Sequence, residues 1–201
     1  MRGKSPSVSG VLLAGGASRR MGGVNKALLE LGGVRIVERV ARAMKRVFPE
    51  VILITNTPSV FEFLLVPSFR DIIPGHGSLG GLYTGLRTCT GDYAFLAACD
   101  MPFIDERVLR YMTGLITGED IIAPKIGGHW EPLHAIYSRS CLPHIERLMQ
   151  EHDLKIINIF KDLKVRAICE DELKQFDPEC RFLMNVNTPE DVRQARKMVA
   201  R

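Results

Sequence analysis

The stretch LLAGGASRRMGGVNKALLEL, residues 12–31, is the part of the chain that decides the fold. An apolar run ends in two glycines, arginines and a lysine follow, and apolar periodicity then resumes. Free backbone N–H groups beside fixed cations suit a polyphosphate, because both bind phosphate oxygens. A glycine-rich turn that only reverses the chain is the alternative interpretation. Arg19, Arg20 and Lys26 favour the phosphate site over that turn.

The spacing of this stretch excludes two familiar phosphate-binding motifs. A P-loop ends in Gly-Lys-Ser/Thr, and the stretch contains no Gly-Lys pair. The dinucleotide fingerprint G-x-G-x-x-G fails as well, because Gly15 and Gly16 are adjacent. The sequence therefore predicts a phosphate-binding loop of another kind.

Composition limits the class of protein. The length of 201 residues predicts one domain over 1–201. The sequence shows no apolar run near 20 residues and no signal-peptide pattern, so we expect a cytoplasmic protein without membrane contact. The net charge of +4 is spread along the chain, which suits an anionic small substrate and gives little support to nucleic-acid binding. The five cysteines lack C-x-x-C spacing, so we expect neither disulfides nor zinc.

Strand patterns and helix patterns alternate along the chain. The predicted strands are 8–14, 51–55, 69–73, 93–100, 164–169 and 182–187, with a hairpin over 121–137 that turns at Gly127 and Gly128. The predicted helices are 36–47, 58–65, 79–89, 105–116, 141–151, 154–162 and 188–199. Ser78 is expected to cap one helix, and Thr188 with Asp191 forms a capping-box pattern on the last.

This alternation predicts an α/β fold whose sheet is mostly parallel, with helices on both faces and a small antiparallel hairpin. Such sheets bind ligands beyond the carboxyl ends of their strands. The glycine loop, Asn56, Asp71 and Asp100 each follow or end an apolar run. We therefore expect them along one rim of the sheet.

Five motifs occur in a fixed order along the chain: LAGGASRRMGGVNK (13–26), RDIIPGHGSLGGL (70–82), AACDMPF (97–103), HWEPLHAIY (129–137) and FLMNVNTPED (182–191). Together they resemble the motifs of the molybdenum cofactor guanylyltransferases, small nucleotidyltransferases with a three-layer Rossmann-like fold. The chain departs from this pattern at Asn25, where the family has an aspartate, and at Ser78, where it has a proline.

The resemblance implies that GMP passes from GTP to the phosphate of molybdopterin, with release of pyrophosphate. It implies Lys26, Asp100 and Arg20 as catalytic residues, with Mg²⁺ on Asp100. It implies GTP contacts in the N-terminal half at Leu13, Ala14, Gly15, Gly16, Lys26, Asp71 and Asp100. In the C-terminal half it implies molybdopterin contacts at Asn185 and Asn187, which would share one face of a strand. Transient contacts with molybdoenzymes or their chaperones are also implied.

Three alternatives stay open at this point. A molybdopterin cytidylyltransferase would share the glycine loop and the C-D-x-P motif, although the N-V-N-T-P segment favours the guanylyl enzyme. A non-catalytic nucleotide-binding protein is disfavoured by the presence of both Lys26 and Asp100. An RNA-binding domain would need the stacking aromatics that the chain lacks. Near the hairpin, His129 and Trp130 are candidates for the acceptor side, and packing on the sheet is the favoured role of Trp130.

Overall fold

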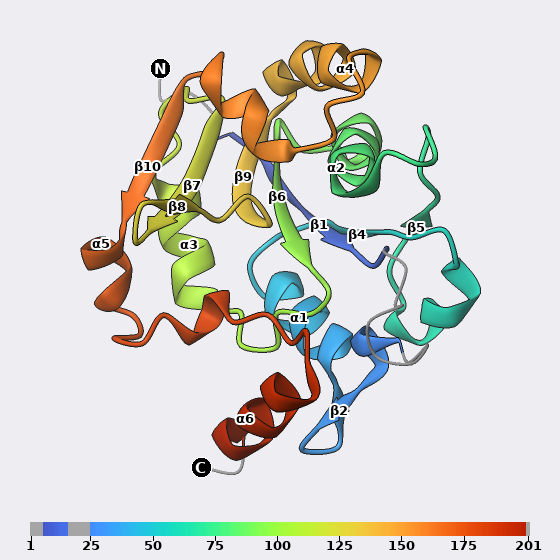
Figure 1. Cartoon of the computed structure of the whole chain (residues 1–201), viewed down its shortest axis with the longest axis vertical. Coiled ribbons are helices and arrows are strands. Elements are labelled where there is room, and N and C mark those ends of the chain that lie inside the picture. The colour runs from blue at the N-terminus through green and yellow to red at the C-terminus, as the bar shows by residue number, and fades with distance from the viewer. Residues whose placement is uncertain (1–5, 16–24, 200–201) are drawn as a thin grey trace.

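The computed structural model describes residues 6–15 and 25–199, and within them the predicted α/β alternation is confirmed (Figure 1). In these residues eight strands form one sheet in the order β10-β7-β9-β6-β1-β4-β5, with β8 paired to β7. The strands of this sheet are β1 Val8–Leu13, β4 Val51–Ile54, β5 Ser68–Phe69, β6 Tyr93–Ala98, β7 Ile121–Ile126, β8 His129–Trp130, β9 His134–Ser138 and β10 Val165–Cys169.

The sheet is mainly parallel, as the sequence predicts. β1 lies between β4 and β6 and is parallel to both, β5 continues this direction beyond β4, and β10 is parallel to β7. The exceptions are β9, which is antiparallel to both β6 and β7, and the short β8, which is antiparallel to β7. The predicted hairpin is also confirmed: β7 and β8 pair across Gly127 and Gly128, whose φ angles of 54° and 84° suit glycine.

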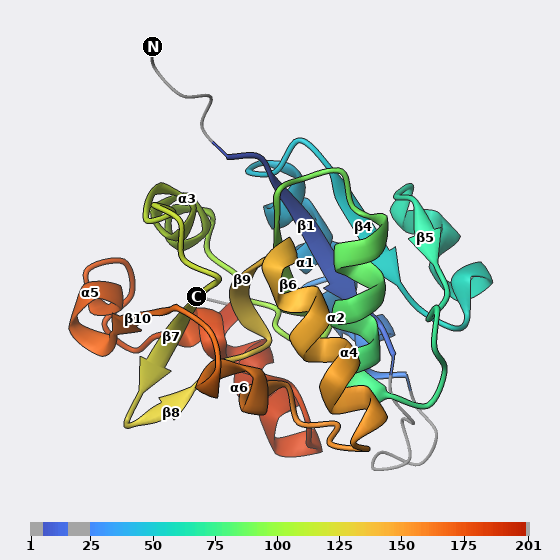
Figure 2. The same ribbon diagram turned by 90° about the horizontal axis from the view of Figure 1, so that it is seen from above.

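Helices cover both faces of the sheet. The α-helices are α1 Ile36–Lys45, α2 Gly77–Thr88, α3 Glu106–Gly114, α4 Leu142–Gln150, α5 Glu170–Lys174 and α6 Pro189–Val199. One core lies between the sheet and α1 with α3, and the other between the sheet and α2 with α4, which lie side by side in Figure 2. β1 serves both cores because its residues alternate, with Leu12 in the first and Val11 in the second.

The glycines of α2 bring that helix close to the sheet. A Cβ added at Gly85 would lie 2.5 Å from Cγ1 of Val11, and one at Gly81 would lie 2.9 Å from Cδ2 of Leu13. A side chain at either position would push against β1, the strand that leads into the glycine loop, and the clash is hardest to relieve at Gly85 because Val11 is β-branched and stiff.

Three predictions about local structure are wrong. The strand expected at 69–73 ends at Phe69, because the chain turns there and the backbone N–H of Asp71 donates to the side chain of Asn56. The strand expected at 182–187 is a 3₁₀ turn, η6 (Arg181–Leu183), followed by chain outside any strand. Ser78 lies inside α2, whose N-cap is His76, so it does not cap that helix.

The remaining elements are short. The segments predicted as helices at 58–65 and 154–162 are 3₁₀ helices, η3 (Pro58–Leu64) and η5 (Ile156–Lys161), and η4 spans Arg139–Cys141. Sequence patterns missed α5 and the small hairpin of β2 (Glu30–Leu31) and β3 (Val34–Arg35), which follows η2 (Lys26–Leu28). Among the helices of residues 6–15 and 25–199, none has the length and hydropathy needed to span a bilayer.

Candidate active site

A hollow of about 370 Å³ lies where β1, β4 and β6 end. Segments far apart in the sequence line it, and they include Ala14, Gly15, Lys26, Asn56, Asp100 and Asn187. The two described ends of the glycine loop, Asn56 and Asp100 therefore share one rim, as the sequence predicts, whereas Asp71, the fourth feature expected there, does not line the hollow. Leu13 is buried at the end of β1, directly before this rim. The candidates Gly16, Arg19 and Arg20 lie outside the described residues.

Asp100 is the acidic group of the hollow. It follows β6, and its Oδ1 atom is buried and has no hydrogen-bond partner among the residues that the structure describes. Burial raises the pKa of its carboxyl group, while its backbone N–H and the charge of Lys26 act in the opposite direction. A buried carboxylate oxygen without a partner is unfavourable unless a ligand supplies positive charge or a hydrogen bond. Asp100 thus offers a carboxylate oxygen that a bound cation could satisfy.

The fit to a hard divalent cation follows from this oxygen. Mg²⁺ prefers oxygen ligands and is commonly held by one or two carboxylates together with substrate phosphates. In the described part of the chain, no three His, Cys, Asp or Glu residues gather around a possible metal position. The protein can thus contribute the Asp100 carboxylate, and a polyphosphate substrate would complete the coordination.

Lys26 is the cation of the hollow, and it begins η2. The residue before it, Asn25, caps this short helix, since its Oδ1 accepts a hydrogen bond of 3.2 Å from the backbone N–H of Ala27. Asparagine and aspartate cap helices about equally well, so the amide of Asn25 preserves this turn. Lys26 Nζ donates to Oδ1 of Asn187 at 3.0 Å, which joins residues 161 positions apart.

Asn56 and Asp71 form a reciprocal pair at the side of the hollow. Asn56 Nδ2 donates to Oδ2 of Asp71 at 2.7 Å, and the Asp71 backbone N–H donates back to Asn56 Oδ1 at 3.2 Å. Asn56 lines the hollow itself, with Thr55 and Thr57 on either side of it. Asp71 is thus connected to the hollow by its hydrogen bonds to Asn56. Asn56 itself follows β4 and the buried residue Thr55.

The structure separates the two asparagines that the sequence placed on one face. Asn187 lines the hollow and contacts Lys26, whereas Asn185 Nδ2 lies 3.4 Å from the carbonyl oxygen of Leu183. The same-face argument was wrong because residues 184–188 are not a strand. The capping box predicted for the next helix is confirmed: Thr188 N–H donates to Asp191 Oδ2 at 2.7 Å, and Asp191 N–H donates to Thr188 Oγ1 at 3.2 Å.

Two further sequence interpretations concern cysteines and aromatic residues. All five cysteines are free thiols, and Cys99, which lines the hollow, has its pKa raised to about 12 by burial and by the neighbouring Asp100. It remains a protonated thiol and supplies no nucleophile. Trp130 packs against Phe160 with ring centroids 5.1 Å apart, and Lys125 Nζ lies 5.1 Å from its ring. The favoured packing role of Trp130 is confirmed.

Sequence reasoning missed Thr55, Thr57 and Cys99 as residues of the hollow. The signal that could have found them is their place at the ends of β4 and β6, directly beside the selected Asn56 and Asp100. Residues at the carboxyl ends of adjacent parallel strands meet at one edge, whatever their type.

Comparisons with known proteins agree with this geometry. A family model described as the MobA-like NTP transferase domain matches residues 10–165. The molybdenum cofactor guanylyltransferase of Desulfosudis oleivorans is 36% identical over 194 residues, covering 96% of each chain. The crystal structure of molybdopterin-guanine dinucleotide biosynthesis protein A from Archaeoglobus fulgidus has a TM-score of 0.83 at 28% identity, covering 96% of this chain and 98% of that one. A Mycobacterium tuberculosis protein solved as a manganese complex shares the fold, with a TM-score of 0.64 at 16% identity over 95% and 98% of the chains.

Proposed function

The chain belongs to the family of proteins with a MobA-like NTP transferase domain, and from this premise we propose that it transfers GMP from GTP to the phosphate of molybdopterin. The products are pyrophosphate and the molybdopterin guanine dinucleotide. The names of the D. oleivorans guanylyltransferase and of the A. fulgidus protein both support this pair of substrates.

One observation carries the proposal for this chain: Oδ1 of Asp100 is buried without a hydrogen-bond partner in the described part of the chain, and Asp100 lines the same hollow as Lys26. A carboxylate for a hard cation and a lysine for phosphate oxygens are the two charges that nucleotidyl transfer requires. A protein that only bound a nucleotide would gain little from keeping an unsatisfied buried oxygen in its site, since such a group costs stability.

The reaction needs positioning and charge neutralisation, and it needs no covalent enzyme intermediate. An acceptor phosphate oxygen attacks the α-phosphorus of GTP. A new P–O bond forms as the bond from the α-phosphorus to the bridging oxygen breaks, and that oxygen leaves on pyrophosphate. Backbone groups at the end of β1 and in the loop after it, those of Leu13, Ala14, Gly15 and Gly16, are proposed to contact the nucleotide. Lys26 and Arg20 are proposed to stabilise the negative charge that moves onto the leaving group.

Asp100 is proposed to hold a divalent cation, with Mg²⁺ as its natural identity. A bound cation at this position supplies Lewis-acid neutralisation of the triphosphate oxygens. The manganese complex of the structural neighbour supports a divalent metal in this fold. Asp71, fixed by Asn56, is proposed as a further nucleotide contact on the same rim.

The acceptor is proposed to bind on the C-terminal side of the hollow, near Asn185. The N-terminal half of residues 1–201 would then bind GTP and the C-terminal half molybdopterin, within one domain. A cytoplasmic location, and brief contacts that pass the product to molybdoenzymes or their chaperones, complete the proposed role.

A nucleotide panel tests the proposed function. The purified chain is incubated with molybdopterin, Mg²⁺ and either GTP, CTP or ATP, and pyrophosphate release is followed. We expect GTP to be preferred, by up to about 10⁴ if buried groups of the site hydrogen-bond the base edge. The variant Asp100→Asn serves as the matched control, because it keeps the shape of the side chain and removes its charge.

The same panel separates the alternatives. Turnover of CTP equal to or better than that of GTP would replace the guanylyl assignment with the cytidylyl one. Binding of nucleotide without pyrophosphate release from any member of the panel would favour a non-catalytic nucleotide-binding protein.

A further inference from the structure

A third, smaller hydrophobic cluster joins the segment after η2 to the last segment of the described chain. It contains Leu31 and Ile36 from the segment after η2, and Val186, Val192 and Ala195 from the last segment and α6. Figure 1 shows α6 beside the β2 hairpin, apart from the central sheet. Val186 of this cluster directly precedes Asn187, and Ala27, the residue after Lys26, belongs to the first core, so both sides of the contact between Asn187 and Lys26 are packed.

Asn187 is itself held firmly from both sides. Its backbone N–H donates to Oδ2 of Asp191 at 2.8 Å, and the same oxygen accepts from the N–H of Thr188. These bonds lower the pKa of the Asp191 carboxyl, with the bond from Asn187 as the main cause. On the other side, the N–H of Val186 donates to the carbonyl oxygen of Asp100 at 2.8 Å. The backbone at 186–188 is thus tied both to α6 and to the residue after β6.

The chemistry of the contact suits orientation of a cation. The ammonium group of lysine is a point charge on a flexible four-carbon stem, so its position depends on what it contacts. Oδ1 of Asn187 accepts one of its three N–H bonds at 3.0 Å. Because the amide is neutral, it holds the ammonium without cancelling the charge. Among the described residues the ammonium has no second hydrogen-bond partner, so its other two N–H donors could meet phosphate oxygens.

We propose that Asn187 is a positioning residue of the donor side, which holds the ammonium of Lys26 where the phosphates of a nucleoside triphosphate bind. This assignment replaces the pterin contact that the family resemblance implies for this residue, and it leaves Asn185 on the acceptor side. It rests on the proposed function for the identity of the nucleotide. The contact between Asn187 and Lys26 is a property of the free chain.

The test combines a labelling experiment with a binding experiment. Acetylation of Lys26 by acetic anhydride, followed peptide by peptide in a mass spectrometer, reports how the amine is held without any substrate. In Asn187→Ala we expect Lys26 to react several-fold faster than in the unmodified chain, because the ammonium loses its acceptor. GTP affinity should fall about tenfold, as the loss of a hydrogen bond to a charged group predicts. Gln194→Ala, an exposed amide on α6, is the matched control and should change neither quantity.

A second variant keeps the test decisive should the alanine variant fold poorly. Asn187→Asp retains an acceptor oxygen, so Lys26 should react as slowly as in the unmodified chain. GTP affinity should still fall, because the new carboxylate repels phosphate and neutralises the lysine. If Asn187 had only a structural role, Asn187→Asp would not combine an unchanged rate of Lys26 acetylation with a lower GTP affinity.

Other results would overturn the inference. Unchanged Lys26 reactivity and GTP affinity in Asn187→Ala, with a raised KM for molybdopterin, would return Asn187 to the acceptor side. Equally fast labelling in the alanine and aspartate variants would show that Oδ1 does not hold the lysine. If the unmodified chain bound no GTP, the proposed function would fail, whereas the labelling result would still decide whether Asn187 holds Lys26.

Discussion

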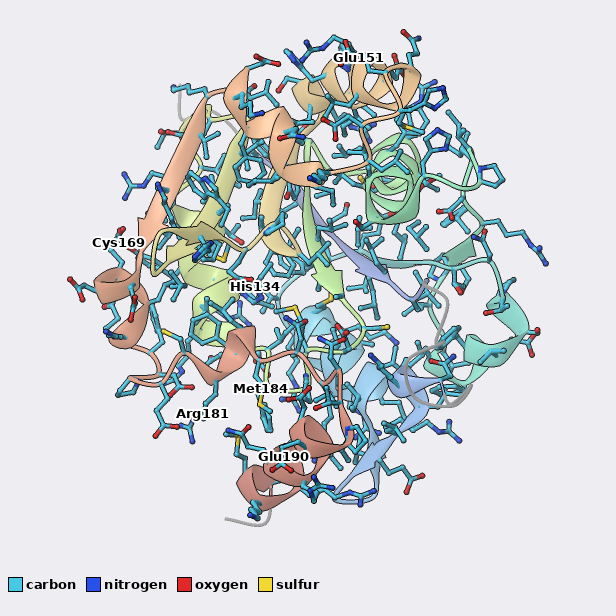
Figure 3. All side chains as sticks on the ribbon, viewed as in Figure 1. His134, Glu151, Cys169, Arg181, Met184 and Glu190 are labelled. Carbon is cyan, nitrogen blue, oxygen red and sulfur yellow. The ribbon has the colours of Figure 1, made fainter. Side chains whose placement is uncertain are left out.

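His134 should make the stability of this protein sensitive to acid, and His134→Leu should remove that sensitivity. The side chain is fully buried on β9, near the centre of the molecule in Figure 3. Its ring centroid lies 5.0 Å from that of Phe95 and 5.6 Å from that of Phe182. Neither ring nitrogen has a partner among the described residues, and burial lowers the pKa of His134 to about 3.

The sign and size of the effect follow from these values. Above the pKa of about 6.5 in the unfolded chain, both states carry neutral histidine and stability is at its full value. As the pH falls below 6.5, the unfolded chain binds a proton that the folded protein does not accept, so stability is lost progressively down to about pH 3. One pKa unit corresponds to about 1.36 kcal/mol, so the loss between about pH 7.5 and pH 5.5 is about 1.4 kcal/mol.

The assay is urea unfolding at these two pH values, followed by the fluorescence of Trp130, which is the single tryptophan of the chain. The unmodified protein should lose about 1.4 kcal/mol more than His134→Leu between them. His144→Leu, a half-buried histidine on α4, is the matched control and should keep the loss of the unmodified protein. Equal losses in the unmodified protein and in His134→Leu would refute the reasoning, because they would mean that the folded protein protonates His134 freely.

Three further predictions concern the hollow and the packing that supports it. Asp100→Asn should lower kcat by about 10² or more with little change in Tm, because removing one electrostatic group of an active site commonly has an effect of this size. The measurement is turnover across a magnesium titration. Lys26→Ala should lower kcat/KM by at least about 10², equivalent to about 2.7 kcal/mol of transition-state stabilisation, measured by pyrophosphate release. Gly85→Ala should destabilise the fold by about 1–3 kcal/mol in urea, because its Cβ would lie 2.5 Å from Cγ1 of Val11.

Each of these predictions has an outcome that contradicts it. Near-normal turnover of Asp100→Asn with unchanged magnesium dependence would move the metal elsewhere on the rim, with Asp71 as the next candidate. Activity of Lys26→Ala within a few-fold of the unmodified chain would make Lys26 a solvated surface residue. A fully stable Gly85→Ala would mean that α2 can move away from β1 at little cost.

Local signals were sufficient for much of this fold. The alternation of buried runs and helical periodicity predicted the mainly parallel sheet, because strands buried on both faces must be apolar throughout. The turn at Gly127 and Gly128 and the capping box at Thr188 and Asp191 were predictable because their partners lie within a few residues. The rim with Asn56 and Asp100 followed from strand ends alone.

The failures come from features that depend on distant parts of the chain. Residues 182–187 contain an apolar run, but Phe182 is buried against His134, and this packing competes with pairing to a neighbouring strand. The run after Phe69 leaves the sheet because Asn56 binds the backbone of Asp71, a contact across 15 positions. Periodicity within a window carries no information about such partners.

The two charged residues of the hollow, Lys26 and Asp100, both contact the segment that precedes α6. Val186 binds the backbone of Asp100, and Asn187 binds the ammonium of Lys26, so one short segment touches both charged residues. The segment is anchored at its start by Phe182 against His134 and at its end by Asp191 on α6. A shift of this segment would therefore disturb the contacts of Lys26 and of Asp100 together, since these contacts lie on adjacent residues. Under the proposed reaction, which relies on placing charge around a phosphorus atom, this connection would make the closing segment a support for both charged residues, although it contributes no charge of its own to the hollow.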